Sequence, residues 1–427
     1  MLSKSQAYSR ALRTAVIGAL ALLAGCSNTA AGDIAAATKG DSAAARKIKN
    51  PVVVTPPPPP PTSPTTTIDF SVPADIADNF PTANGIETYG LGLAEQGQLP
   101  PESGDPVGAF RVTCPGSAAK VGQFDPMVFP GQAQAGHMHT FGVNDGISPN
   151  TTYTSLRTSG SGCNAPASYA VYRSAFWFPS MLDGAGNAVM PDYFNTYYKQ
   201  LPATDPNCQI RATACVPLPN GLRFVEGWNM TTMTGGPGGY FECWIDDNQS
   251  QRVPGTGRTG SIATLVAQGC GKPMANGKYP LLVYQTGGPE CWDGKNIDSA
   301  DHRSHVAYPN RAVTGVIGTG GNSNYGCPLT HPYLIPMISI RLVFTTDANL
   351  ATWRFSCDDM TATKVAGTCG HFDYWEAWSP TVKATWQKYC IDGHKSCSGG
   401  DLGNGTQIKG LVRWPQTWQR HVLVPLG

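Results

Sequence analysis

Apolar and polar positions alternate along much of the chain from residue 108 onward, beginning with the segment 108–114. A period of two residues is typical of a half-buried β-strand. The longest such run, 333–346, places its large apolar residues on one face: Ile338, Ile340, Leu342 and Phe344. Further strands are expected at 168–178, 221–228, 240–245 and 279–284.

Helical patterns are scarce, and the best of them is the segment 379–390. Ser379 is a suitable N-cap and Pro380 suits the first helical position. Val382, Trp386 and Tyr389 then form one apolar stripe. The chain also holds 49 glycines and 36 prolines, which favour turns over long helices. The sequence therefore predicts a mainly β domain, a sandwich or jelly-roll-like fold with long loops and a few short helices.

The first 25 residues have the pattern of a signal peptide, with a basic start and a short apolar run. The run ends in Leu23-Ala24-Gly25-Cys26, which resembles a bacterial lipobox and implies lipidation of Cys26. An ordinary cleaved signal with an incidental Cys26 is the alternative. Ser27, following the cysteine, favours sorting to the outer membrane. We therefore expect an exported protein with a lipid anchor in the membrane.

Residues 26–67 are rich in Ala, Thr, Ser and Pro, including the proline run Pro56–Pro61. Such a segment has few bulky apolar groups to bury, so a disordered tether is expected, with a polyproline ligand as the competing interpretation. Residues 68–427 are then expected to form a single β-rich globular domain.

Twelve of the 13 cysteines follow Cys26. In an exported chain, this even number predicts up to six disulfides of undetermined connectivity. The pairs Cys208 with Cys215 and Cys390 with Cys397 are spaced for short local loops. The predicted domain is therefore disulfide-rich, and reduction is expected to unfold it more readily than chelation.

Charge and motifs exclude several function classes. Only 14% of the residues are charged, the net charge is +1, and no basic cluster marks a nucleic-acid partner. No phosphate-binding loop, dinucleotide fingerprint, nucleophile elbow or H-E-x-x-H is present. Nucleotides are therefore not expected as ligands, and the neutral composition suits an extracellular glycan or a cell-wall polymer as partner.

The charged and histidine residues gather in four blocks. The densest runs from Cys291 to Pro309 as C-W-D-G-K-N-I-D-S-A-D-H-R-S-H-V-A-Y-P, an ordered, turn-rich loop next to an apolar strand. The others are 125–128 with 136–140, 327–332 and 370–373. Together the blocks hold six of the eight histidines: His137, His139, His302, His305, His331 and His371.

These four blocks resemble a secreted family whose members share a domain of unknown function, numbered nineteen-ninety-six. The resemblance covers about residues 110–400. The resemblance implies that the chain contains this domain and is secreted. It implies no reaction, because the family has no established activity.

The histidines point to a metal centre. An extended backbone would place His137 and His139 on the same side, a workable geometry for two ligands of one metal. His305 and His371 are the further candidates, and His305 is preferred to His302. His331 is expected to support the loop. Imidazoles with Asp301 or Asp373 would suit one transition metal, Zn, Mn, Fe or Cu.

A centre without metal is also coherent, with histidine as general base and a carboxylate orienting it. The candidate catalytic residues in either case are His137, His139, Asp301, His305, His371 and Asp373. Turn-capping is the alternative role for the aspartates of the central loop.

Candidate substrate-binding residues come from the same loop and from the aromatic residues: Trp292, Asp293, Lys295, Asn296, Arg303 and Trp375. Trp378, Trp414 and Trp418 are further aromatic residues that would stack on sugars or pack in the core. The leading hypothesis is a glycan hydrolase or lyase anchored at the surface. A non-catalytic glycan-binding or envelope structural lipoprotein, or a metal-capture protein, remains open.

Overall fold

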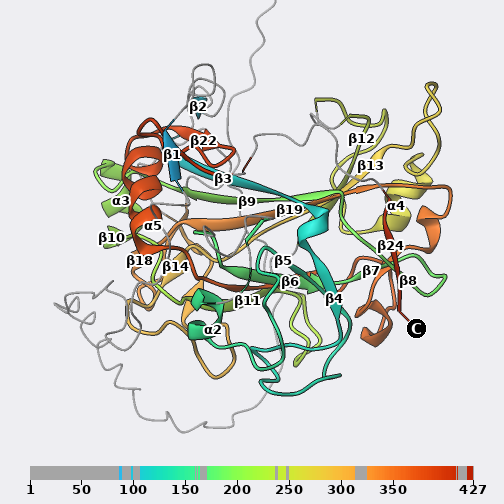
Figure 1. The fold of residues 1–427 in the computed structure, drawn as a ribbon, viewed down its shortest axis with the longest axis horizontal. Coiled ribbons are helices and arrows are strands. Elements are labelled where there is room, and N and C mark those ends of the chain that lie inside the picture. Colours follow the sequence, from blue (N-terminus) through green and yellow to red (C-terminus); the bar gives the residue numbers. More distant parts are fainter. Residues whose placement is uncertain are drawn as a thin grey trace, which may run out of the picture. The chain divides into compact units, whose positions relative to one another are not determined.

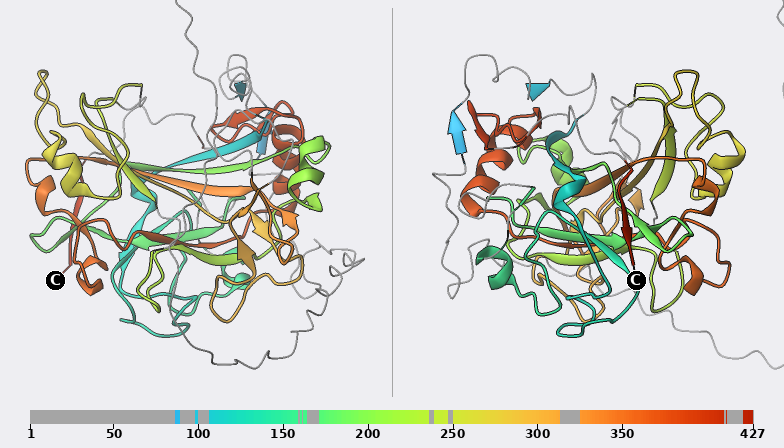
Figure 2. Two further views of the ribbon diagram at one scale, coloured as in Figure 1. Left: turned by 180° about the vertical axis from the view of Figure 1, so that it is seen from behind. Right: turned by 45° about the vertical axis from the view of Figure 1, so that its right-hand side comes forward.

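Two stacked antiparallel sheets form the body of the computed structural model, with β3, β9 and β19 in one layer and β5, β6 and β11 in the other (Figure 1). Figure 2 shows the same two layers from behind. The structure describes residues 86–88, 98–99, 106–158, 160, 162–163, 171–235, 239–246, 250–312, 325–409, 411 and 421–426. The signal peptide, Cys26, the tether, Trp414 and Trp418 lie outside these residues.

The larger sheet has the order β12-β13-β19-β9-β3-β22-β2 and is antiparallel except where β22 joins β3. Its strands are β12 (Tyr240–Trp244), β13 (Leu281–Gly287), β19 (Met337–Thr345), β9 (Tyr193–Gln200), β3 (Gly108–Pro115), β22 (Ser396–Ser398) and β2 (Gln98–Leu99).

The smaller sheet has five strands in the order β11-β21-β6-β5-β4, all antiparallel. They are β11 (Arg223–Gly227), β21 (His371–Trp375), β6 (Ala175–Pro179), β5 (His139–Gly142) and β4 (Lys120–Gly122). Apolar residues of both sheets, among them Phe110, Phe178 and Leu342, share one buried core. The predicted mainly β sandwich is confirmed.

Short strands join in four further sheets. One has the order β10 (Ala214–Cys215), β18 (Tyr333–Leu334), β14 (Cys291–Trp292) and β15 (Val306–Ala307); another has β20 (Arg354–Phe355), β7 (Met181–Leu182), β8 (Asn187–Val189) and β24 (Leu423–Pro425). Two are pairs, β1 (Ile86–Thr88) with β23 (Thr406–Ile408) and β16 (Arg311–Ala312) with β17 (Tyr325–Gly326).

The described helices are short: α2 (Tyr153–Thr158), α3 (Pro206–Arg211), α4 (Ile262–Ala267) and α5 (Pro380–Trp386). In the described part of the chain, no helix has the length and apolar character needed to cross a bilayer. The 3-10 helices are Gly116–Ala118, Leu350–Thr352 and Asp358–Met360.

Two predicted elements differ from the observed ones. The run 333–346 splits into β18 and β19, in different sheets, at Pro336, which has no N–H to give to a ladder. After α5 the chain widens into a π-helix over Gln387–Ile391. The extra residue in this turn moves the apolar stripe on by one position, so Cys390 is buried and Tyr389 is exposed. The prediction for Tyr389 was therefore wrong, whereas Val382 and Trp386 are buried as expected.

All twelve cysteines after Cys26 are paired, so the prediction of six disulfides is confirmed. The bridges are Cys114–Cys163, Cys208–Cys215, Cys243–Cys270, Cys291–Cys327, Cys357–Cys369 and Cys390–Cys397. They include both predicted local loops. Several pin long connections between strands to the core.

Reduction should therefore unfold the protein under conditions in which chelation does not. Each bridge is expected to stabilise the fold by about 2 to 4 kcal/mol. Thermal melting followed by circular dichroism, with dithiothreitol or with a chelator, measures the difference. A larger loss of Tm in the chelator than in the reductant would contradict this prediction.

Candidate metal centre

The pleat of β21 separates two kinds of side chain. Phe372 and Tyr374 point into the core between the sheets, whereas His371, Asp373 and Trp375 occupy the opposite face. His139 begins β5 two strands away and faces the same side, because its neighbour at i+2, Phe141, packs in the second cluster with Trp375. His137 lies in the turn before β5. Three histidines from two segments thus meet on the outer face of the smaller sheet.

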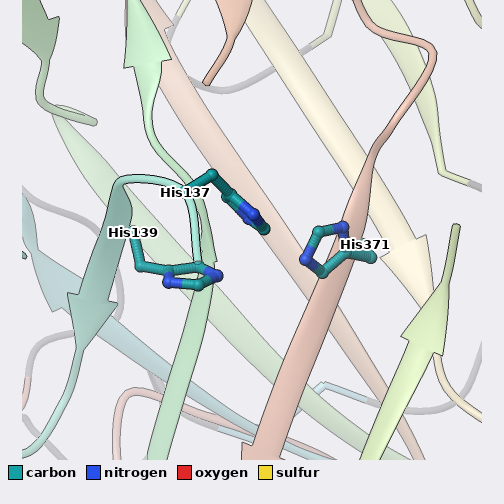
Figure 3. Close-up of side chains that lie close together, drawn as sticks. All are labelled: His137, His139 and His371. Carbon is teal, nitrogen blue, oxygen red and sulfur yellow. The ribbon is translucent and has the colours of Figure 1, made fainter. Parts of the chain in front are cut away.

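The three imidazole rings lie against one another and point toward a common space (Figure 3). The ring centroid of His137 is 4.1 Å from that of His139 and 5.0 Å from that of His371. One potential ligand atom from each residue lies within 4.8 Å of the others. Asp125 and Asp373 form an overlapping group with His139 by the same measure. The predicted convergence of the histidine blocks thus brings His137, His139, His371 and Asp373 together.

Backbone carbonyls orient two of the rings. His139 Nδ1 is 2.9 Å from Phe124 O, and His371 Nδ1 is 2.8 Å from Cys369 O. Because a carbonyl only accepts, each Nδ1 carries the proton, and each Nε2 presents a lone pair. This second-sphere arrangement is the usual one for histidines that bind metals.

Several polar atoms at the centre are buried without a hydrogen-bond partner in the described structure. They are His137 Nε2, His139 Nε2 and both carboxylate oxygens of Asp373. The nearest Asp373 oxygen is 3.9 Å from His371 Nε2, too far for a hydrogen bond. Buried polar groups without partners are costly, and a cation bound by either group of ligand atoms would satisfy part of this need.

Burial keeps the histidines neutral. It lowers the pKa of His371 to about 3, and the neighbouring His139 adds to the effect. Burial also lowers the pKa of His137 and of His139. It raises the pKa of Asp373 well above its usual range, reinforced by the charge of Asp125. Neutral imidazoles are the form that binds metal, so the nitrogens need release no proton at physiological pH.

The three histidines line a cavity of about 490 Å³. Its other walls come from the segments around Phe129, Asn229 to Thr232, and Ala300 to Arg303. Arg303 donates to two backbone carbonyls, Gly227 O at 3.2 Å and Trp228 O at 2.9 Å. A cavity of this size has room for a small organic ligand beside the centre.

A disulfide loop positions His371. The bridge Cys357–Cys369 encloses Asp358, whose buried carboxylate accepts from the backbone N–H groups of Phe355, Gly367 and Cys369. These bonds fix Cys369, whose carbonyl in turn holds the ring of His371. The loop therefore links a disulfide directly to the orientation of one proposed ligand.

Glycine is required where β11 approaches the start of β21. Gly227 has φ of +80°, and a Cβ there would lie 2.6 Å from Gly370 O. A larger residue at this position would push His371 away from the other histidines.

The two histidines of the central loop do not lie as expected, and among the described residues neither belongs to a cluster of possible metal ligands. His305 is buried outside the cluster, with Nδ1 2.8 Å from Ser299 Oγ and Nε2 2.9 Å from Arg223 O. Both of its ring nitrogens are therefore occupied, and His305 does not join the ligand set. His302 instead lines the cavity, with Nδ1 2.8 Å from Asp298 Oδ1. His302 has a positive φ of 54°.

The aspartates of the central loop cap turns. Asp293 accepts from the backbone N–H groups of Lys295 and Asn296. Asp301 accepts from those of Arg303 and Ser304, so it lines the cavity but is held by its own turn. Asp301 is therefore not placed to act with the three histidines.

Most of the predicted substrate-binding residues lie away from the cavity. Lys295 and Asn296 are exposed on the loop, whereas Trp292 and Trp375 are buried. Trp292 donates to Asn296 O at 2.6 Å, and the Arg223 guanidinium lies over the ring of Trp375. Of the predicted set, Arg303 lines the cavity. His331 contacts Ser304 O and Thr330, in keeping with its expected support of the loop.

A match between the sequence and a family model identifies the family of the chain. The family model described as Domain of unknown function (DUF1996) matches residues 125–378, more than half of the chain. The chain belongs to this family. No curated protein and no solved structure matches it. All three clustered histidines and Asp373 lie inside the DUF1996 domain.

Several residues of the cavity and its surroundings were not predicted from the sequence. Asp125 was noted as part of a block but not as a ligand candidate, although it starts the segment that leads to His137. Phe129 and Met360 line the cavity and are exposed at 37% and 51%. No local pattern marks such residues, since they come from loops whose packing is not periodic.

Glu226 is a further buried acid that the sequence analysis overlooked, although a glutamate within an apolar strand is a recognisable signal. It points to the sandwich interior, where Tyr308 donates to it at 2.9 Å and the Thr286 hydroxyl also donates to it. Burial raises the pKa of Glu226 to about 8, against the opposing effects of these hydrogen bonds and of Arg303. At neutral pH the folded protein therefore holds a proton on this residue.

The substitution Glu226→Gln should flatten the dependence of stability on pH. An unfolded glutamate releases its proton near pH 4.3, whereas the folded one keeps it up to about pH 8. The wild-type protein should thus lose stability as pH rises through this window, by at most about 1.4 kcal/mol per pH unit. Urea unfolding at pH 5 and at pH 8 measures this. Equal losses in the wild type and the variant would contradict the assignment.

Proposed function

We propose that this protein is an exported, surface-anchored enzyme that cleaves extracellular polysaccharide or cell-wall glycan at a metal centre. The ligands are His137, His139 and His371, with Asp373 as the adjoining carboxylate. The observation that carries the proposal is the set of buried nitrogens and oxygens without partners at the wall of a cavity. Imidazoles with a carboxylate fit Zn, Mn, Fe or Cu.

The side chains at the centre have different proposed roles. The three histidines would hold the ion, and the carbonyls of Phe124 and Cys369 fix two of the rings. A bound ion of this kind supplies Lewis acidity toward a water, hydroxyl or carboxylate group. Asp373, with both carboxylate oxygens otherwise unpartnered, either joins the ligand set or accepts a proton beside it. Arg303 supplies positive charge to the same cavity.

A mechanism without metal has less support. A general base works best with a pKa near the operating pH, and burial lowers that of His371 to about 3. His305 and Asp301, two further candidates for acid and base, are occupied by hydrogen bonds within their own loop and its neighbours. Metal capture without catalysis uses the same ligands, but it has no need of a cavity of about 490 Å³ beside them.

Glycan as the substrate class is supported by the cavity walls and the low charge of the chain. Asn229, Thr231 and Thr232 are neutral polar residues of the wall, and the side chain of Phe129 is partly exposed there. Export is supported by the six disulfides, which form in oxidising compartments, and by the signal-like start of the sequence.

Metal removal should abolish cleavage. Wild-type protein treated with a chelator is expected to release no oligosaccharide from cell-wall or exopolysaccharide preparations, and one of the four metals should restore release. His137→Ala, at a partly buried position, should lower the rate by about 100-fold or more without unfolding the protein. Product is measured as new reducing or unsaturated ends.

The matched control is His394→Ala, which removes an exposed histidine outside the four blocks. Its rate should equal that of the wild type. Full activity in the chelator, or in His137→Ala, would contradict a catalytic metal centre.

The anchor is tested separately. Cys26→Ser removes the thiol that acylation needs, so the full chain should move from the membrane fraction to the soluble fraction. Fractionation followed by immunoblotting measures this. An unchanged membrane share would contradict lipidation at Cys26.

A further inference from the structure

Arg303 gives the cavity a cationic wall. Among the described residues that line it, Arg303 is the only lysine or arginine. Its two hydrogen bonds to Gly227 O and Trp228 O fix the guanidinium plane. A guanidinium has five N–H donors, so it retains donors beyond these two. Arg303 is therefore a preorganised donor group beside the centre.

Phe129 gives the cavity an apolar wall close to the histidines. A Cβ built on Gly136 would be 3.5 Å from Phe129 Cε2, so the ring lies against the residue next to His137. The side chain is nevertheless 37% exposed, and Val128 and Met360, which also line the cavity, are exposed at 41% and 51%. Exposed apolar groups gathered at a cavity are typical of a binding surface.

We infer that the cavity binds a sugar residue carrying a carboxylate, as in an acidic polysaccharide of uronic acids. Phe129 packs against the apolar face of the sugar ring, and Arg303 donates to the carboxylate. The inference rests on the proposed function, because it names the glycan class for the same centre.

The chemistry favours a carboxylate over a phosphate. Planar guanidinium and carboxylate groups pair through two parallel hydrogen bonds. Asp125, Asp301 and Asp373 also line the cavity, so a phosphate with close to two negative charges would meet more repulsion than a carboxylate with one. The ring of Phe129 is the reason for proposing that the carboxylate belongs to a sugar, since flat aromatic side chains pack well against the C–H groups of a pyranose.

The test is calorimetric binding to the metal-loaded full chain. The probes are trisaccharides of galacturonate, mannuronate and glucuronate, each with its carboxyl-reduced counterpart. At least one acidic trimer should bind, and its reduced counterpart should bind about tenfold more weakly or worse. Arg303→Gln should weaken the acidic trimer about tenfold and leave the reduced trimer unchanged. Phe129→Ala should weaken both, and Phe129→Tyr should restore binding.

Lys295→Gln is the matched control, because it removes a positive charge from the same loop at an exposed position outside the cavity. Its affinity should stay within about twofold of the wild type. Equal affinity for acidic and reduced trimers, or an equal loss in Lys295→Gln and Arg303→Gln, would overturn the inference while leaving the metal centre intact. Failure of every trimer to bind metal-loaded protein would also overturn it. A chain that takes up no metal would instead overturn the proposed function.

Discussion

The burial of polar atoms without partners is the constraint on which the rest of this site depends. His137, His139 and Asp373 present nitrogens and oxygens that are closed off from water and meet no donor or acceptor in the described structure. Each such group would cost about 1 to 3 kcal/mol if it stayed unsatisfied. A protein of marginal stability retains an arrangement of this kind where a ligand compensates for it. Imidazole nitrogens and carboxylate oxygens are ligand atoms that a metal ion can bind together.

The sandwich supplies the rigidity that such a centre needs. Strand β21 lies between β11 and β6. Asp373 pairs with both neighbouring strands, and His371 pairs with Gly227 of β11. The inner face of the same strand is anchored by Phe372 and Tyr374 in the main core. The loop closed by Cys357–Cys369 then orients the imidazole of His371. Core packing, the disulfide and the hydrogen bond to Cys369 O thus all help to fix the position of the His371 side chain.

Much of the fold was predictable from local pattern, because alternation is a property of neighbouring residues. Strands β3, β12 and β13 lie within or close to the expected runs, and both seven-residue disulfide spacings were identified. The split at Pro336 and the π-helix after α5 were not predicted. The π-helix depends on a hydrogen-bond pattern that no residue type predicts. Pro336, by contrast, is a residue type that signals a break in a strand.

The site was partly predictable for the same reason. Histidines two residues apart, His137 and His139, were recognised as a pair, although His137 lies in a turn and not in the strand. His371 and Asp373 were also found through their composition. The choice between His302 and His305 could not be made from sequence, because it depends on tertiary contacts such as that of His305 Nε2 with Arg223 O. Likewise, no spacing shows that Trp292 is buried while Phe129 is exposed.

The most direct test is the metal content of the full, oxidised chain, measured by elemental mass spectrometry after purification without chelators. The account predicts one equivalent of a transition metal, retained through gel filtration and lost in the double variant His137→Ala/His139→Ala, with circular dichroism showing that the fold is kept. Absence of metal in the wild type after reloading with Zn, Mn, Fe and Cu, or the same content in the variant, would contradict the metal centre.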